Sequence, residues 1–267
     1  MDIRLDNDQS NLAIQDNELI RSAYTMTLIE KRLLLHAISK VDSHAMSKSG
    51  QNISVEITAK QWQKLYDTPQ PWRDLKNASR KLMNRQVTIN PTDRQTVVMN
   101  WIDNTEYNSD SVKISFGSRI SKYLTGMLTK FTQIDLLDVA KFDSVYTVRL
   151  YELLSQVEKK SVSDSWLKIS VDEFRVVFDL GDKDDRFSYL NQRVLTPSIK
   201  ELNQKSGWDI TLRTIKKGRA VHMLHFEFSP KAQRELFEDV KKDKVESSKN
   251  SRSKVTAAIM NISDTDW

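Results

Sequence analysis

The chain has 267 residues, of which 39% are hydrophobic and 29% charged, with six glycines and five prolines. This composition is typical of a folded protein and excludes collagen-like and wholly disordered chains. No apolar run reaches the roughly 18 residues of a membrane span, and charged residues occupy the start of the chain, so we expect a cytoplasmic protein without membrane contact. Because there is no cysteine, disulfides, thiolate nucleophiles and cysteine-ligated metals are excluded.

The net charge of +5 is concentrated in two short segments. Residues 187–219 carry seven basic and two acidic side chains, and residues 71–94 carry six basic and two acidic ones, so the rest of the chain is net negative. Such a distribution indicates that each segment faces a polyanion. Scattered solubilising charge is the alternative.

In the first half, a capping box at Thr27-Leu-Ile-Glu30 predicts a helix that starts at residue 28. Alternation of Ile53, Val55 and Ile57 predicts a strand. Helices are then predicted over 59–66 and 72–85, and strands over 86–90, 96–104 and 111–116.

The second half repeats this order. An apolar stripe from Tyr146 to Val157 predicts a helix that begins after Asp143 or Ser144. A strand over 167–171, a short helix over 172–178 ended by Gly181, a helix over 187–206 and a hairpin that turns at Gly218 follow. The sequence therefore predicts an α+β protein with tandem winged-helix (helix-turn-helix) domains, each a small helical core with a β-hairpin wing.

The outer face of the predicted 187–206 helix has the chemistry of a major-groove reader, since Arg can bridge guanine and Gln or Asn can bridge adenine. Its candidate DNA-binding residues are Arg186, Tyr189, Gln192, Arg193, Thr196, Lys200 and Asn203, with Arg193 foremost. Pro197 conflicts with a regular helix, and we expect either a kink or a new helix with Thr196 as its cap.

The matching face in the first half has more charge and fewer amides, so it suits phosphate contact. Its candidates are Arg73, Lys76, Asn77, Arg80 and Lys81. At the hairpin tips, Lys216, Lys217 and Arg219 in the second half, and Arg94 in the first, are expected to reach phosphate or a minor groove.

Catalytic and cofactor sites are not expected. His222 and His225 are separated by an odd offset that places them on opposite faces of a strand. The acidic run of Asp179, Asp182, Asp184 and Asp185 lacks the pattern of a calcium loop, and no nucleotide-binding glycine motif occurs. We therefore predict no enzyme activity, no metal and no cofactor.

Several runs together resemble a known family, the replication initiator (Rep) proteins of iteron-containing bacterial plasmids. They are Asn17-Glu-Leu-Ile-Arg-Ser-Ala-Tyr24 followed by Glu30-Lys-Arg-Leu-Leu-Leu35, Phe131-Thr-Gln, Val148-Arg-Leu-Tyr-Glu-Leu-Leu154, Ile169-Ser-Val-Asp-Glu-Phe174, Arg193-Val-Leu-Thr-Pro-Ser-Ile-Lys-Glu-Leu-Asn203, Lys216-Lys-Gly-Arg219 and Phe226-Glu-Phe228. The resemblance implies two winged-helix domains that bind directly repeated origin DNA. It also implies recruitment of the host replication initiator and replicative helicase, and dimers that repress the protein's own gene.

On this reading, residues 1–130 form a first domain for backbone contacts and a candidate dimer surface, residues 131–230 form a base-reading domain, and residues 231–267 form a polar, disordered tail. Two alternatives stay open. A winged-helix transcription regulator would lack tandem repeats beside its gene, and a relaxase or nuclease would nick supercoiled DNA.

Overall fold

At matching places in the two halves of the chain, a hydroxyl side chain at the end of a strand caps the helix that follows. The computed structural model describes residues 11–42, 52–90, 96–125, 130–158, 165–181 and 186–230. Thr58, the last residue of β2, accepts a hydrogen bond from the Gln61 amide (3.1 Å) and caps α3. Ser170, the last residue of β8, accepts one from the Glu173 amide (3.0 Å) and caps α8. Each cap pairs an amide that the helix itself leaves without a partner.

The first half is a winged helix. It consists of α2 (Leu28–Ser39), β2 (Ile53–Thr58), α3 (Ala59–Tyr66), α4 (Pro71–Leu82), β5 (Asn104–Tyr107) and β6 (Ser111–Phe116). The capping box predicted at Thr27 is present, with Glu30 as its partner. The three strands pair antiparallel in the order β2-β6-β5. A separate hairpin of β3 (Gln86–Ile89) and β4 (Val97–Asn100) and a short helix α5 (Ser118–Ser121) are added to this half.

The second half repeats the architecture, as predicted. It consists of α7 (Val145–Val157), β8 (Ser165–Ser170), α8 (Val171–Val177), α9 (Phe187–Leu190), the π-helical turn η1 (Asn191–Leu195), α10 (Thr196–Lys205), β9 (Trp208–Lys217) and β10 (Ala220–Pro230). Its sheet has the strand order β8-β10-β9, so in both halves the first strand pairs with the last.

A two-stranded sheet between the halves was not predicted. Strand β1 (Leu12–Asp16) pairs antiparallel with β7 (Phe131–Asp135), with Leu12 opposite Asp135 and Asp16 opposite Phe131. Each strand leads directly into a short helix, α1 (Asn17–Ile20) or α6 (Leu136–Lys141), whose first turn is capped by the aspartate that ends the strand.

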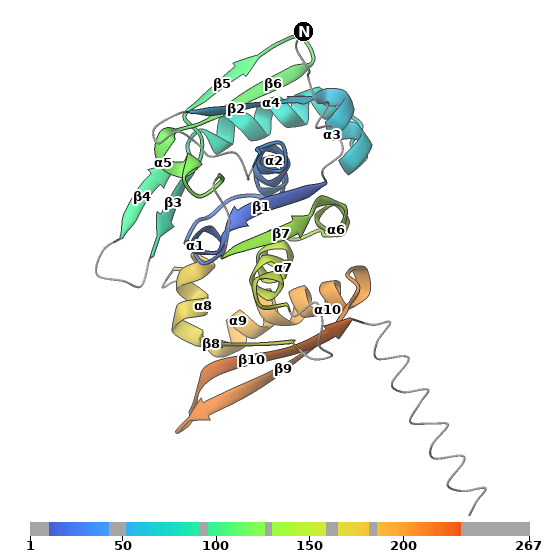
Figure 1. Ribbon diagram of the computed structural model, residues 1–267. Coiled ribbons are helices and arrows are strands. Elements are labelled where there is room, and N and C mark those ends of the chain that lie inside the picture. Colours follow the sequence, from blue (N-terminus) through green and yellow to red (C-terminus); the bar gives the residue numbers. More distant parts are fainter. Residues whose placement is uncertain are drawn as a thin grey trace, which may run out of the picture.

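The two halves are related by a pseudo-twofold axis that passes through the β1–β7 pair. Figure 1 views the molecule roughly along this axis: α1 lies opposite α6, α2 opposite α7 and α3 opposite α8. The repeat inferred from the order of elements is therefore larger than predicted, because it also includes a strand and a short helix before each winged helix.

The strand predicted over 96–104 is wrong, because it is two strands in two sheets. Trp101 and Ile102 separate β4 from β5 and are almost completely buried (0% and 1% exposed), so the chain turns inward between them. As a result β5–β6, and not β3–β4, is the counterpart of the β9–β10 wing. The first basic segment, residues 71–94, therefore ends between the strands of the added β3–β4 hairpin and not in the wing, so Arg94, expected at the hairpin tip of the first half, does not belong to the wing.

Candidate nucleic-acid interface

The helix predicted over 187–206 contains a π-helical turn just before its proline. Pro197 cannot donate a backbone hydrogen bond, and its ring crowds the carbonyl four residues earlier. The wider turn η1 accommodates this misfit. Pro197 does lie in the first turn of α10, but Thr196 is already helical (φ −59°, ψ −48°), and its hydroxyl donates a hydrogen bond to Asn191 Oδ1 (3.3 Å). Of the two alternatives expected at Pro197, the structure therefore contains a distortion of the helix, and Thr196 does not act as a helix cap.

The outer face of this helical segment is polar and accessible. Its exposed residues are Arg186, Tyr189, Gln192, Arg193, Thr196 and Lys200. The opposite side is buried through Leu190, Val194, Leu195, Ser198 and Leu202. The Arg193 guanidinium lies 5.9 Å from the centre of the Tyr189 ring, close enough for a cation–π contact. The side chains chosen for their chemistry thus share one face, and their contact with DNA stays a prediction.

Glu201 fastens this helix to the start of α7. Its carboxylate accepts hydrogen bonds from the Asp143 amide (2.5 Å) and the Thr147 hydroxyl (2.6 Å). Lys205 Nζ donates to the same carboxylate (2.9 Å) and to Asp143. These hydrogen bonds to Asp143 and Glu201 raise the pKa of Lys205. Residues at the start of α7 therefore hold the C-terminal half of α10 on its inner side. These contacts leave the outer face of the helix exposed.

Asn203 has a structural task that sequence reasoning missed. Its side-chain amide donates to the Ile210 carbonyl (2.9 Å), and its side-chain oxygen accepts from the Ile210 amide (2.7 Å). This pair of bonds ties the end of α10 to the base of the wing. Both polar atoms of the amide are used in this way, and contact of Asn203 with DNA stays a prediction.

The wing has the geometry that the sequence predicts. Strands β9 and β10 run antiparallel up to the pair Lys217–Ala220, and Gly218 has the positive φ (64°) that the turn needs. Lys216, Lys217 and Arg219 are exposed at its end. Figure 1 shows this hairpin projecting well beyond the helices of its half.

In the first half, α4 presents a second basic face. Arg73, Asn77, Arg80 and Lys81 are exposed. Lys76 is half-buried, and its ammonium lies 5.8 Å from the ring centres of both Trp72 and Tyr107. The Arg85 guanidinium donates to both carboxylate oxygens of the buried Glu30 (3.0 and 3.2 Å), so its charge is paired within the first half. Arg94 lies outside the residues that the structure describes.

Counting charges along the sequence overstates the free positive charge of both segments. Lys205 is paired with Asp143 and Glu201, Arg213 lies 3.1 Å from a Glu227 oxygen, and Arg85 is paired with Glu30. Among the described residues of the two segments, the exposed cations without an ion pair lie on α4, on η1 and α10, and at the β9–β10 tip; they are Arg73, Arg80, Lys81, Arg193, Lys200, Lys216, Lys217 and Arg219.

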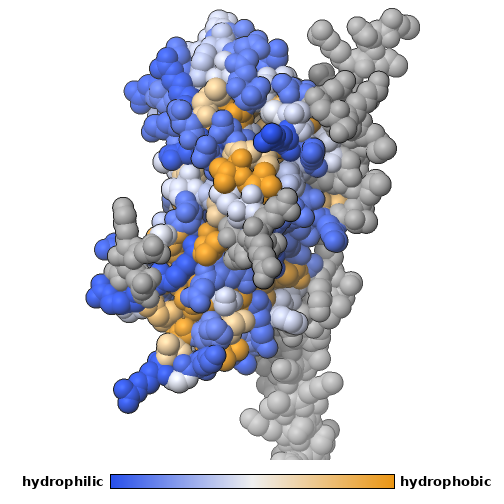
Figure 2. All heavy atoms as spheres, turned by 90° about the vertical axis from the view of Figure 1, so that its left-hand side faces the viewer, coloured by the Kyte–Doolittle hydropathy of each residue, from blue (hydrophilic) through white to orange (hydrophobic). Residues whose placement is uncertain are grey.

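Hydrophobic side chains also reach the surface on the side where the β3–β4 and β9–β10 hairpins end. Figure 2 shows this side: it is largely hydrophilic, with several groups of hydrophobic residues between its upper and lower parts. Large hydrophobic residues with substantial exposure belong to elements on this side, among them Val98 on β4, Val176 on α8, Tyr189 on α9 and Ile215 on β9.

Within the described ranges, no group of three or more His, Asp or Glu side chains is arranged to hold a metal ion. Over the same residues, none of the helices combines the length and the apolar character that crossing a bilayer requires. Of the acidic run considered above, Asp182, Asp184 and Asp185 lie outside the described residues, as does the tail over 231–267.

Two family models match the chain. The initiator replication protein WH1 model matches residues 12–155, and the initiator Rep protein WH2 model matches residues 170–228. The first of these runs through α7, so it ends later than the boundary at residue 130 that we expected from the sequence.

Individual proteins of known sequence or structure are also similar to this chain. A replication initiation protein of Escherichia coli is 28% identical over 233 residues, which cover 86% of this chain and 73% of that protein. An uncharacterized 27.6 kDa protein of Escherichia coli is 24% identical over 211 residues, covering 72% and 84% of the two chains. Among solved structures, the Pi initiator protein in complex with iteron DNA superposes with a TM-score of 0.69 at 21% identity, covering 83% of this chain and 98% of that one.

The duplicated winged helix, the basic helix faces and the match of the WH1 model over more than half of the residues therefore lead to one conclusion: this chain belongs to the family of plasmid replication initiator proteins with two winged-helix domains.

Proposed function

We propose that this chain binds double-stranded DNA at direct repeats of a plasmid origin and thereby initiates replication. The observation that carries the proposal is the pseudo-twofold relation between two winged helices. Each has exposed basic side chains on its third helical segment, which is α4 in the first half and residues 186–205 in the second. A helix-turn-helix dimer reads two major grooves about one helical turn apart by the same symmetry. Here a single polypeptide supplies both reading units. The Pi initiator, which shares the fold, is bound to iteron DNA in its crystal structure.

We assign base reading to the second half and backbone contact to the first. Support comes from the mixture of side chains on the 187–205 helical segment, where Arg193 and Gln192 can pair with purine edges. On α4 the exposed groups are mainly cationic and suit phosphates. We place the division between the two domains near residue 130, just before β7, because α7 holds α10 through Glu201 and so belongs with the base-reading unit.

A footprint on the non-coding DNA beside the protein's own gene tests the proposal. We expect protection of tandem repeats, with each copy covered over about two turns of the duplex. Arg193→Ala should weaken binding to the repeat by about 1 to 3 kcal/mol and relax specificity at one position, whereas Arg80→Ala should weaken all duplexes alike. Equal losses on repeat and random DNA for Arg193→Ala would contradict the assignment of base reading to the second half.

Initiation, as distinct from transcriptional regulation, needs a separate test. A plasmid that carries only the repeats and the duplex next to them should replicate when the protein is supplied in trans, and should fail to do so with Arg193→Ala. Family membership implies that the host initiator and replicative helicase are recruited at this step. Loading of purified helicase onto the supercoiled plasmid, with and without the protein, measures that recruitment directly.

We also propose that the first half forms dimers that repress the protein's own gene. Strand β4 supports this, because no described strand pairs with its outer edge and Val98 on it is 54% exposed. An open strand edge favours pairing with a second copy. Val98→Lys should shift the molar mass measured by light scattering toward the monomer and release repression of a promoter fusion.

A further inference from the structure

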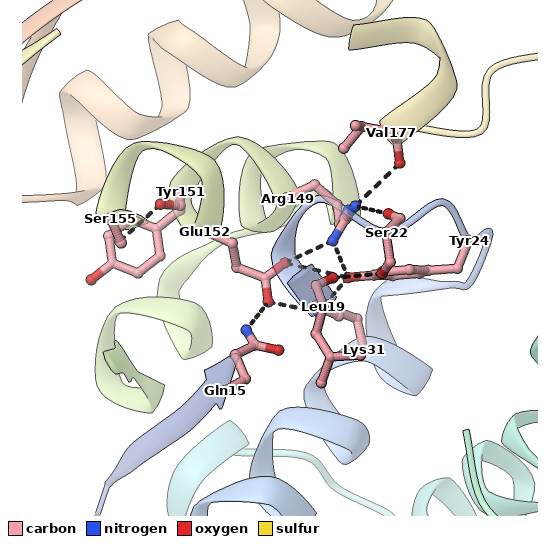
Figure 3. Close-up of polar contacts among 10 residues, drawn as sticks. All are labelled: Gln15, Leu19, Ser22, Tyr24, Lys31, Arg149, Tyr151, Glu152, Ser155 and Val177. Carbon is pink, nitrogen blue, oxygen red and sulfur yellow. Dashed lines mark hydrogen bonds and ion pairs between the residues drawn. The ribbon is translucent and has the colours of Figure 1, made fainter. Parts of the chain in front are cut away.

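The two halves of the molecule meet through a cluster of buried charged and polar side chains (Figure 3). Gln15, Tyr24 and Lys31 come from the first half, and Arg149 and Glu152 come from α7 of the second. Lys31 and Glu152 have no exposed surface, and Arg149 is 3% exposed. The cluster therefore lies in the interior of the molecule, where an unpaired charge is strongly unfavourable.

Each charge in this cluster has at least one partner across the boundary between the halves, and Arg149 and Glu152 also pair with each other within α7. Lys31 Nζ lies 2.7 Å from Glu152 Oε1 and donates to the Tyr24 hydroxyl oxygen at 2.6 Å. Gln15 Nε2 donates to Glu152 Oε1 (2.7 Å), and Arg149 contacts both Glu152 Oε2 (3.3 Å) and the Tyr24 hydroxyl. Separating the halves would leave Lys31 with only Tyr24 as a partner.

Two arginines at equivalent places extend this arrangement symmetrically. Arg32, on α2, donates to the carbonyls of Ala140 and Phe142 at the end of α6 (both 2.8 Å). Arg149, on α7, donates to the Ser22 carbonyl just after α1 (2.8 Å). Each arginine thus reaches from the first long helix of its own half to the end of the short helix of the other half.

Such contacts hold the halves in one orientation. Interfaces between domains normally allow relative motion, because they are small and polar. Apolar contacts tolerate a small slide, but a buried charge that moves away from its partner is left desolvated and unpaired. The paired backbones of β1 and β7 limit the same motion. An altered angle between the halves would therefore break several of these bonds at once.

We infer that the Arg149–Glu152–Lys31 cluster is a positioning device that sets the angle and distance between the two DNA-reading helices, and hence the spacing of base pairs that the protein accepts within one repeat. This inference rests on the proposed function, because it concerns how the two halves occupy a single DNA site. Lys31, Arg149 and Glu152 would contribute to specificity without contacting DNA.

The test compares DNA sites that differ only in internal spacing. One duplex carries a single copy of the repeat defined by the footprint, and others carry one or two base pairs inserted or deleted between its two protected segments. One inserted base pair rotates the segments by about 34° relative to each other, so we expect wild-type binding to weaken about tenfold or more. With Arg149→Lys, which keeps the charge but loses the fork, the same insertion should weaken binding by about threefold or less.

Arg85→Lys is the matched control. Arg85 also forms a forked ion pair with a buried carboxylate, that of Glu30, but both residues belong to the first half. We expect this variant to keep the full spacing penalty of the wild type. An equal reduction in both variants would show that loss of stability, and not orientation, lowers the penalty.

A second measurement needs no DNA and remains informative if Arg149→Lys folds poorly. Because the chain has no cysteine, spin labels can be placed at the exposed positions Gln63 and Gln204 alone. The distance distribution between them should be narrow in the wild type and broader with Arg32→Lys or Arg149→Lys. Unchanged spacing penalties and unchanged distance distributions would overturn the inference. A wild type that does not prefer the repeat would instead refute the proposed function.

Discussion

The cationic tip of the wing offers a quantitative test of DNA contact. Lys216, Lys217 and Arg219 are exposed, and none of them forms an ion pair within the described residues. If each contacts one phosphate, replacing all three with glutamine should reduce the dependence of log K on log salt by about 2.7, since each phosphate contact contributes about 0.9. Raising salt from 50 to 200 mM should then cost the variant about fortyfold less affinity than it costs the wild type.

Fluorescence anisotropy with a labelled duplex, titrated at several salt concentrations, measures this slope. Repeat and random duplexes should show the same reduction, because phosphates carry no sequence information. The control replaces Lys113 and Lys141, which are paired with Glu106 and Asp138, and should leave the slope unchanged. A triple variant that keeps the wild-type slope, or a control that loses as much, would refute the assignment of the wing to the DNA backbone.

Three further outcomes follow from individual contacts. Asn203→Ala should lower the free energy of unfolding by about 1 to 3 kcal/mol in urea, because it leaves the Ile210 amide and carbonyl without their partner; an unchanged midpoint would show that this tie is dispensable. Gly218→Ala should cost about 1 kcal/mol because of its φ of 64°, whereas Gly207→Ala, where an added Cβ meets nothing within 4 Å, should cost distinctly less. Burial lowers the pKa of Lys31 from 10.5 to about 8, so above pH 8 the unfolded chain binds a proton that the folded chain has lost. The free energy of unfolding should therefore rise between pH 8 and 9.5, and Lys31→Met should remove that rise.

Local signals in the sequence were sufficient for most of the secondary structure. The Thr27 capping box, the alternation of Ile53, Val55 and Ile57, and the Lys-Gly-Arg turn act through neighbouring residues, and the structure contains each of them. Short-range hydrogen bonds and side-chain periodicity have the same meaning wherever they occur. The order of elements then led to the duplicated winged helix.

Pairing between distant segments could not be derived in this way. Strands β1 and β7 are five residues each and become strands by pairing with one another across more than a hundred residues. The alternation in Phe131-Thr-Gln-Ile-Asp135 was a usable signal, but so short a run is ambiguous without its partner. The same holds for Asn203, since its role depends on Ile210 being within reach.

By itself the sequence determined the type of module, its duplication and the residues available for DNA contact, because caps, periodicity and composition are properties of neighbouring residues. Only the tertiary structure decided which positive charges are free and how the halves are held together. Whether Arg85, Lys205 or Arg149 faces solvent, a carboxylate or the other half depends on which surfaces are packed together, and packing is a property of the whole chain.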